Sequence, residues 1–282
     1  MTAPSLQEIV CCMGQPVAGN PTQYMMEKAF IAAGLDWRYL TCEVPAAQLP
    51  DAMRGMRAFG FRGGNFTIPH KVAVIEHLDS LSTAAELMQA VNCVNRVGDQ
   101  LIGENTDGKG FVQSLREVID PAGKRVVIIG AGSAARAIAV ELGLAGTEHL
   151  TIVNRSLPRG QELTDLLVTK AKLQAEFVHL VGDYEVTPDT HILVNATSIG
   201  LGDAGAKVPV ALDTIVAPLV VADVIFNPPQ TWLIRNAAER GCTTIDGLGM
   251  LVNQAVISFK IWTGIDPDAS VMREALEEFL GI

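Results

Sequence analysis

The segment 64–71, GNFTIPHK, places several polar side chains where a short predicted strand meets a predicted helix. Lys71 would lie in the first turn of that helix, where a cation opposes the helix dipole and gives up its proton more readily. An amine of this kind suits a proton donor and acceptor in catalysis. An ordinary surface lysine would produce the same pattern, so the segment alone leaves both interpretations open.

A second polar group flanks a predicted hairpin. Asn92 lies on its first arm, and the segment 105–108, NTDG, follows its second arm. Because a hairpin brings its flanks together, Asn92 and Asp107 would face one site, and Asp107 beside Lys71 would hold the ammonium group in place. Aspartate followed by glycine at a helix start is also a common N-cap. The spacing therefore leaves both roles of Asp107 open.

A glycine-rich turn follows four β-branched residues at 126–129 and precedes a predicted helix over 134–145. In its pattern GxGxxA, Gly130 permits a tight turn, Gly132 lets a pyrophosphate approach the backbone, and Ala135 allows the helix to pack closely on the strand. The strand before it and the helix after it are the context that this motif requires. The turn predicts a dinucleotide site, with a tight turn that binds nothing as the alternative.

The end of the next predicted strand indicates which dinucleotide is bound. NAD sites usually carry a carboxylate there, which bonds the ribose 2′-hydroxyl. Residues 154–159, NRSLPR, contain no carboxylate but offer Arg155, Ser156 and Arg159. Two guanidiniums and a hydroxyl suit a 2′-phosphate through charge-assisted hydrogen bonds. The segment predicts NADP as the cofactor, and a solvated basic loop is the alternative.

The elements that must position these residues alternate along nearly the whole chain. Short apolar runs are followed by helix-like segments, which is typical of βαβ units and a parallel sheet. The β-branched run at 126–129 has the character of a strand buried on both faces. We expect an α/β protein whose chain changes domain near Gly108 and again near Gly247.

Composition excludes several functions. The chain has 282 residues, a net charge of −10, 49% hydrophobic residues and 18% charged residues. A sizeable core is therefore expected, while nucleic acids and anionic membranes are not expected partners. No stretch resembles a membrane span or a signal peptide. The five cysteines form no CxxC pair, so we expect no disulfide framework, no metal site and a cytoplasmic location.

Six segments together resemble the shikimate/quinate dehydrogenase family, and they follow that family's order over nearly the whole chain. They are 64–71, 105–108, 130–135, 154–156, 195–200 (NATSIG) and 247–254 (GLGMLVNQ). The resemblance implies an N-terminal α/β substrate domain, formed by residues 1–107 and 247–282. It also implies a Rossmann-like NADP domain with a doubly wound parallel sheet, formed by residues 108–246.

The resemblance implies reversible hydride transfer between NADPH and a ring ketone, as in 3-dehydroshikimate to shikimate. This reaction belongs to aromatic amino acid biosynthesis. The substrate would be a small carboxylated cyclic polyol, the protein would be a monomer or homodimer, and Lys71 and Asp107 would be the catalytic pair. Substrate contacts would come from Asn20, Thr22, Thr67, Asn92 and Gln254. Cofactor contacts would come from Gly130, Ala131, Gly132, Ser133, Ala134, Asn154, Arg155, Ser156, Arg159, Thr197 and Met250.

The chain departs from the family's pattern at four positions. Asn20 and Thr22 stand where two serines usually grip the substrate carboxylate, Phe226 replaces a common tyrosine, and Cys93 replaces a threonine. Unmatched buried polar groups are costly, so changes of this kind alter substrate preference sharply. A quinate or aminoshikimate-type dehydrogenase therefore stays open, as does a non-catalytic NADP or metabolite-binding protein. A folate-type dehydrogenase is disfavoured, since no Tyr-x-x-x-Lys lies on a suitable helix.

Overall fold

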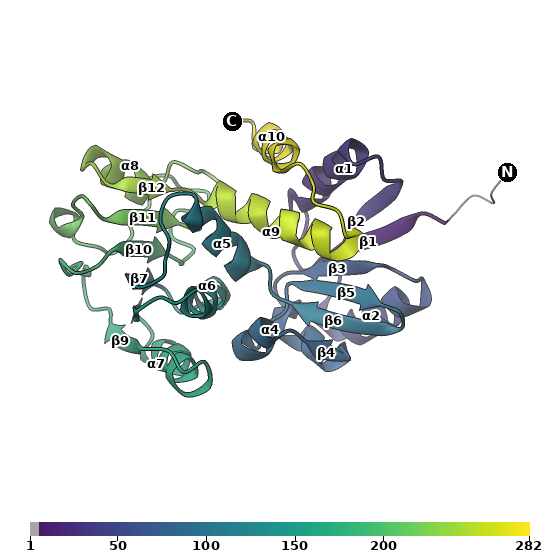
Figure 1. The fold of residues 1–282 in the computed structure, drawn as a ribbon, viewed down its shortest axis with the longest axis horizontal. Helices are drawn as coiled ribbons and strands as arrows, with labels where there is room; N and C mark the ends of the chain where they lie inside the picture. Colours follow the sequence, from purple (N-terminus) through teal and green to yellow (C-terminus); the bar gives the residue numbers. More distant parts are fainter. Residues whose placement is uncertain (1–5) are drawn as a thin grey trace. The chain divides into compact units, whose positions relative to one another are not determined.

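The computed structural model describes residues 6–282 and divides into two compact units (Figure 1). Unit 1 comprises the chain up to Thr106 together with Gln254–Ile282, and unit 2 comprises Asp107–Asn253. Each unit contains a six-stranded sheet of its own. The chain thus leaves unit 1 after Thr106 and returns to it within one long helix, α9 (Gly247–Thr263).

The sheet of unit 1 is mixed, with strand order β2-β1-β3-β5-β6-β4. Its strands are β1 (Glu8–Gly14), β2 (Trp37–Glu43), β3 (Gly63–Phe66), β4 (Ser80–Leu81), β5 (Cys93–Val97) and β6 (Gln100–Glu104). Strand β1 runs parallel to β2 and β3, whereas β5 is antiparallel to both β3 and β6. The predicted hairpin is therefore present as β5–β6, and it lies beside the strand that leads to Lys71.

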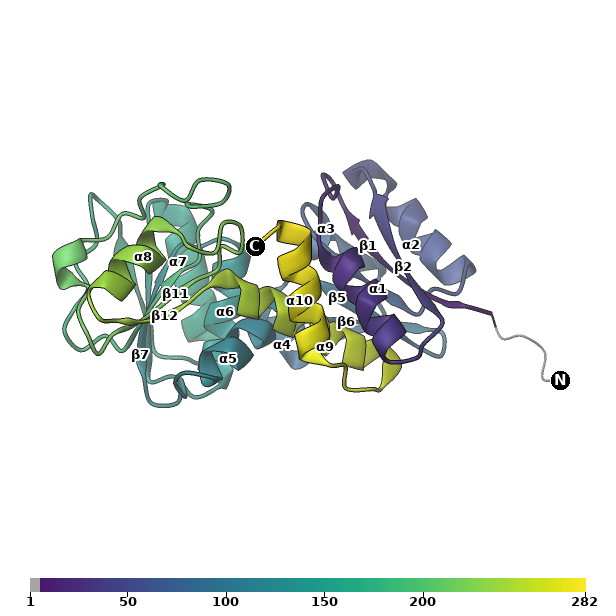
Figure 2. The same cartoon turned by 90° about the horizontal axis from the view of Figure 1, so that it is seen from above.

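Helices cover both faces of this sheet. They are α1 (Thr22–Ala32), α2 (Leu49–Ala58), α3 (His70–Ala73), α4 (Thr83–Met88), α10 (Ala269–Leu280) and the second part of α9. On one face, Met53 and Met56 of α2 pack against Cys11 and Met13 of β1. On the other face, α1 packs on α9, and α1 and α10 lie side by side (Figure 2).

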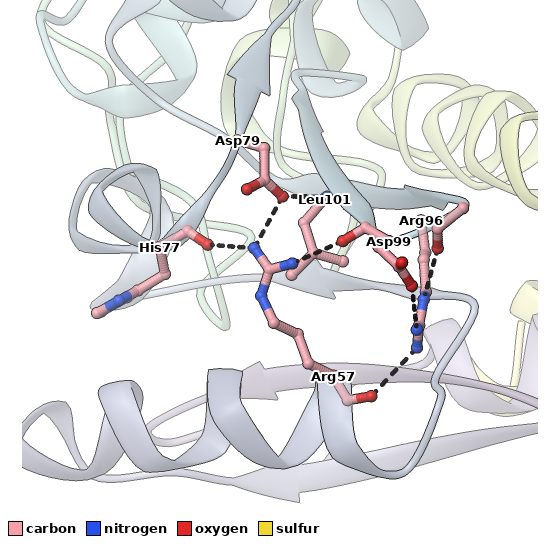
Figure 3. A network of polar contacts seen from close by, with 7 residues as sticks. Arg57, His77, Asp79, Arg96, Asp99 and Leu101 are labelled. Carbon is pink, nitrogen blue, oxygen red and sulfur yellow. Dashed lines mark hydrogen bonds and ion pairs between the residues drawn. The ribbon is translucent and has the colours of Figure 1, made fainter.

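A polar network joins α2 to the β5–β6 hairpin (Figure 3). Arg57 donates to the carbonyl oxygen of Asp99 (2.9 Å) and to Oδ2 of Asp79 (2.8 Å), and the same Oδ2 accepts the backbone N–H of Leu101 (2.6 Å). The Leu101 N–H, followed by the Arg57 guanidinium, holds the pKa of the Asp79 carboxyl below its usual range. Asp79 therefore stabilises the fold in its ionised form.

We expect Asp79→Asn to lower the melting temperature at neutral pH by about 1–2 °C, because exposed ion pairs contribute little. The native pKa of Asp79 lies below its unfolded value, so its stabilisation is present above about pH 4 and is lost as the pH falls through the native pKa. Thermal unfolding of both proteins between pH 3 and pH 7 measures this loss. Asp99→Asn is the matched control, since it removes an exposed ion pair with Arg96 (3.6 Å) but keeps the backbone carbonyl oxygen that Arg57 bonds. A difference in melting temperature between the two proteins that stays constant from pH 3 to pH 7 would contradict the stabilising role of the ionised Asp79.

The sheet of unit 2 is wholly parallel, with strand order β12-β11-β10-β7-β8-β9. Its strands are β7 (Arg125–Ile129), β8 (His149–Asn154), β9 (Ala175–His179), β10 (Ile192–Asn195), β11 (Val220–Asp223) and β12 (Thr243–Ile245). The order reverses between β7 and β10, as in doubly wound dinucleotide-binding folds. The predicted α/β class with its doubly wound parallel sheet is confirmed.

The helices of unit 2 include α5, whose start differs from the prediction. They are α5 (Asp107–Arg116), α6 (Ser133–Leu144), α7 (Leu157–Asp165), α8 (Trp232–Glu239) and the first part of α9. The spacing of the apolar residues between 111 and 119 predicts a helix over residues 110–119, whereas α5 spans Asp107–Arg116. Glycine has low helix propensity, yet Gly108 is needed for packing, since a Cβ there would lie 2.3 Å from the carbonyl oxygen of Ala137 on α6.

No helix among residues 6–282 is both long enough and apolar enough to cross a membrane.

Candidate active site

Lys71 is held where β3 turns into α3. The backbone N–H of Thr67 donates to the carbonyl oxygen of Met13 (3.0 Å), that of His70 to Thr67 (2.7 Å), and that of Val91 to Lys71 (2.7 Å). These bonds tie the turn to β1 on one side and to the segment before β5 on the other. Helix α3 is a single turn, followed by a 3₁₀ turn at Val74–His77. The helix dipole that Lys71 was expected to oppose is therefore small.

A buried polar network lies at the end of β3. Asn65 accepts a hydrogen bond from the Tyr39 hydroxyl (2.8 Å) and donates to the carbonyl oxygen of Asn92 (3.1 Å) and to Ser258 Oγ (3.3 Å). Asn92 Oδ1 in turn accepts the backbone N–H of Thr106 (2.7 Å). All five residues are buried. The network fixes the predicted substrate contact Asn92 and the end of β6, immediately before Asp107.

Cys12 links two parts of the predicted substrate site within unit 1. Burial raises the pKa of its thiol to about 11, and Tyr39 and the charge of Lys71 oppose this shift. Asn20 Nδ2 lies 3.9 Å from Cys12 Sγ, while Asn20 Oδ1 accepts the backbone N–H of Thr22 (2.9 Å). The structure thus brings Asn20 and Thr22 to the end of β1, and the turn that carries Lys71 is bonded to the same strand end through Thr67 and Met13.

The remaining predicted substrate and catalytic residues, together with Met250, differ in burial and in the unit to which they belong. Thr67 and Lys71 are half-buried, and Gln254 on α9 is buried in unit 1, where its carbonyl oxygen accepts from Ser258 Oγ (2.9 Å). Asp107 and Met250 are half-buried and belong to unit 2. Asp107 is the first residue of α5 and follows the buried Thr106 directly.

The glycine turn of unit 2 has the geometry that its sequence predicts. Gly130 has φ +117°, and a Cβ there would lie 2.8 Å from the carbonyl oxygen of Ala196. A Cβ on Gly132 would meet nothing within 4 Å, and Ser133 beside it is exposed at the start of α6. Ala135 is fully buried against the sheet. Open space above backbone amides at a helix start fits a pyrophosphate.

The segment after β8 offers positive charge beside this turn. Asn154 Nδ2 donates to the carbonyl oxygen of Ser156 (2.9 Å), which shapes the turn into α7. Arg155 and Arg159 are exposed, and neither forms an ion pair with any residue among 6–282. Two uncommitted guanidiniums at the end of a strand next to β7 fit the 2′-phosphate of NADP.

Unit 2 therefore brings its predicted cofactor residues, apart from Met250 on α9, to one edge of its sheet. The segment 130–134 follows β7, the segment 154–159 follows β8, and Thr197 follows β10, and these strands are neighbours. In parallel sheets, ligands bind outside the carboxyl ends of the strands, where the order reverses. No group of three His, Cys, Asp or Glu side chains able to hold a metal occurs in the described part of the chain.

The sequence did not single out three residues of these networks: Cys12, Tyr39 and Ser258. Two contacts of the buried network join residues far apart in the chain: Tyr39 and Asn65 are 26 positions apart, and Asn65 and Ser258 are 193 positions apart. Only the polar character of Ser258 between the apolar residues Ile257 and Phe259 gave a signal.

Three family models match the chain. They are the shikimate dehydrogenase substrate binding domain (residues 12–94), shikimate / quinate 5-dehydrogenase (residues 113–199) and the shikimate 5′-dehydrogenase C-terminal domain (residues 247–277). Among curated proteins, the shikimate dehydrogenase (NADP(+)) of Methanopyrus kandleri is 39% identical, covering 96% of each chain.

Two solved structures are also similar. The 5-ketofructose reductase of a Gluconobacter strain is 49% identical, with a TM-score of 0.95, covering 98% of this chain and 99% of that one. The shikimate 5-dehydrogenase of Thermus thermophilus, in complex with NADP(H) and shikimate, is 33% identical, with a TM-score of 0.86, covering 97% of this chain and 100% of that one. The shared architecture spans both units.

Proposed function

Because the chain belongs to the shikimate/quinate dehydrogenase family, we propose that it is an NADP-dependent oxidoreductase that interconverts a ring ketone and its alcohol. The first candidate reaction is the reversible reduction of 3-dehydroshikimate, or a close analogue, to shikimate. The observation that carries the proposal is the carboxyl edge of the unit 2 sheet, where the open Gly132 turn and the exposed Arg155 and Arg159 follow neighbouring strands. We propose that unit 1 binds the substrate and that unit 2 binds NADP.

Lys71 acts as the general acid in reduction. NADPH, held by the glycine turn and by Arg155 and Arg159, would supply the hydride for the carbonyl carbon. The Lys71 ammonium donates a proton to the carbonyl oxygen, and in the reverse direction the neutral amine removes it. Asp107 is the second member of the proposed catalytic pair, and its role is to stabilise the charged form of Lys71. Neither step requires a metal.

The remaining predicted residues have binding roles. Gly130, Ala131, Gly132, Ser133 and Ala134 hold the pyrophosphate at the start of α6. Asn154 and Ser156 shape the loop that carries Arg155 and Arg159, while Thr197 and Met250 line the site. Asn20, Thr22, Thr67, Asn92 and Gln254 hydrogen-bond the hydroxyl and carboxylate groups of a small cyclic substrate. We further propose that the protein acts in the cytoplasm, in aromatic amino acid biosynthesis, as a monomer or homodimer.

A second candidate substrate is 5-ketofructose, a neutral polyhydroxy ketone. Two observations favour it. The Gluconobacter reductase is 49% identical to this chain, whereas the curated shikimate dehydrogenases are 34–39% identical. Asn20 and Thr22 also stand where two serines of the family usually grip the substrate carboxylate, and the side-chain Oδ1 of Asn20 is already committed to the Thr22 backbone N–H. Its amide N–H groups suit a neutral oxygen of the substrate.

One assay tests both candidates. The purified protein is mixed with NADPH and either 3-dehydroshikimate or 5-ketofructose, and the absorbance of reduced nicotinamide is followed. Shikimate, quinate and aminoshikimate are tested with NADP⁺ in the reverse direction, from neutral to alkaline pH. Turnover on 3-dehydroshikimate supports the first candidate, and turnover on 5-ketofructose alone supports the second. Binding of NADP⁺ without turnover on any substrate supports a sensor and overturns both.

The pair Asn20→Ser and Thr22→Ser is expected to shift substrate preference toward the carboxylate by about tenfold or more in kcat/KM. Smaller hydroxyls leave room for a carboxylate and donate to it, and hydrogen bonds to charged groups are worth about 1.5–3 kcal/mol. Serine at position 20 also retains an oxygen that can accept the helix-start N–H. Competing assays with 3-dehydroshikimate and 5-ketofructose measure the ratio. Ala18→Ser, in the same exposed loop, is the control, and an unchanged ratio in the pair would contradict the roles of Asn20 and Thr22.

A further inference from the structure

We propose that Asp223 is a positioning residue for residues 195–200, which we call the cofactor loop. The carboxylate of Asp223 orients the side-chain amide of Asn195, and that amide sets the conformation of the loop. Asp223 itself lies beneath the loop, at the end of β11. The proposal rests on the NADP site proposed above, because the loop matters for function only if it lines that site.

Asp223 is almost wholly buried and accepts three hydrogen bonds. Its Oδ1 accepts Asn195 Nδ2 (2.9 Å) and the backbone N–H of Ile225 (3.1 Å), and its Oδ2 accepts the Thr231 hydroxyl (2.8 Å). Burial raises the pKa of this carboxyl to about 6, against the opposing effect of these three donors. All three partners donate to its two oxygens, so the geometry makes this carboxyl group an acceptor.

An acceptor at this position fixes which way the Asn195 amide faces. The amide nitrogen must point to Asp223, since the reverse orientation would set two oxygens against each other. The same nitrogen also donates to the carbonyl oxygen of Ile199 (3.2 Å). Asn195 Oδ1 is then left facing Thr197, where it accepts both the backbone N–H (3.2 Å) and the hydroxyl (2.7 Å).

The hydroxyl of Thr197 connects Asn195 to the backbone of Ile199. It donates its proton to Asn195, so its oxygen is free to accept the backbone N–H of Ile199 (3.1 Å). The direction of every bond from Asp223 to Ile199 thus follows from the acceptor character of one carboxylate.

The loop set in this way packs on the glycine turn. A Cβ on Gly130 would lie 2.8 Å from the carbonyl oxygen of Ala196 and 3.1 Å from Thr197 Cγ2. The backbone N–H of Ala196 also donates to the carbonyl oxygen of Ile129 (2.8 Å). A change in the loop would therefore move atoms that border the proposed pyrophosphate site, although Asp223 contacts none of the proposed cofactor residues directly.

The test replaces the acceptor while keeping its shape. Asp223→Asn is expected to weaken NADP⁺ binding about tenfold, the effect of one hydrogen bond to a charged group, and to weaken NAD⁺ binding by the same factor. Calorimetry with each nucleotide alone measures both constants. In the assay of the holoenzyme, KM for NADP⁺ should rise about tenfold while kcat at saturating cofactor changes less than about threefold.

Two further variants separate positioning from stability. Thr231→Val removes a different hydrogen bond of the same carboxylate and the cap of α8, so it should lower the melting temperature and leave the NADP⁺ dissociation constant within about twofold. Thr197→Val removes the hydroxyl that joins Asn195 to the Ile199 backbone. The loss of NADP⁺ affinity that it causes should not add to the loss caused by Asp223→Asn in the double variant. Additive losses, or equal weakening by Thr231→Val, would overturn the positioning role.

Asn195→Ala serves if Asp223→Asn does not fold, since it removes the amide and leaves the other two bonds of Asp223 in place. It should reproduce the tenfold loss, and nucleotide binding equal to that of the unsubstituted protein would refute the proposal. Failure of the unsubstituted protein to bind NADP⁺ would instead overturn the proposed function, and the inference with it. Tight binding that Asp223→Asn leaves unchanged would overturn the inference alone.

Discussion

Replacing Lys71 by methionine is expected to reduce kcat by about 10²–10⁴-fold, the range for loss of a general acid–base group. Methionine keeps most of the length and the apolar stem of lysine but cannot transfer a proton. Binding of NADP⁺ by calorimetry should stay within about twofold, because the proposed cofactor residues lie in unit 2 and Lys71 lies in unit 1. Steady-state kinetics on whichever substrate proves active measure kcat and KM separately.

Lys71→Arg separates the charge of the side chain from its proton. Arginine keeps the positive charge but does not give up a proton near neutral pH, so it should be almost as inactive as methionine if Lys71 transfers the proton. Lys260→Met, at an exposed lysine of α9 paired with Asp266, is the control and should leave kcat unchanged. A tenfold loss or less in Lys71→Met, or near-full activity in Lys71→Arg, would reject the general-acid role.

The acidic composition means that the positive charges needed to bind the cofactor must be concentrated locally. The chain carries a net charge of −10, yet its proposed ligands include a nucleotide with three phosphate groups. Arg155, Arg159 and the start of α6 must therefore supply a local positive potential within a negative average surface. Arg57, Arg96 and Arg54 do not share this role, because each is paired with an aspartate in unit 1.

Local chemistry was predictable from the sequence where a motif specifies both a residue and its backbone. The strand and helix around Gly130 and the open space at Gly132 follow from the pattern 126–135. The alternation of apolar runs and helices predicts the α/β class, but it does not give the strand order, because order depends on contacts between distant strands. The short strands β4 and β12, of two and three residues, are too brief to show a period.

The buried networks were not predictable for a related reason. Tyr39, Asn65 and Ser258 come from β2, β3 and α9, and they meet only after the sheet and helix have packed. Asp223 lies in a segment whose neighbours are apolar, and its role depends on an asparagine 28 positions earlier. A family motif readily predicts the side chains that contact a ligand. It does not readily predict the side chains that hold those contacting residues in place.

The pair Arg155→Ala and Arg159→Ala is expected to reduce the preference for NADP⁺ over NAD⁺ by about 10²-fold or more. Each guanidinium can make charge-assisted hydrogen bonds to the 2′-phosphate, worth about 1.5–3 kcal/mol each. Both side chains are exposed and form no ion pair within residues 6–282, so their loss leaves no buried charge behind and should barely affect folding. Binding of NAD⁺, which lacks the 2′-phosphate, should change less than about threefold.

Calorimetry with both nucleotides on both proteins gives this ratio, and its salt dependence supplies an independent check. Screening weakens exposed charge pairs, so raising the ionic strength should weaken NADP⁺ binding more in the unsubstituted protein than in the double variant. Arg125→Ala is the control, because Arg125 starts β7 at the opposite end from the glycine turn and is paired with Asp189 and Glu148. If NADP⁺ and NAD⁺ weaken equally in the double variant, the two arginines support the loop without recognising the phosphate, and the basis for NADP preference lies elsewhere in unit 2.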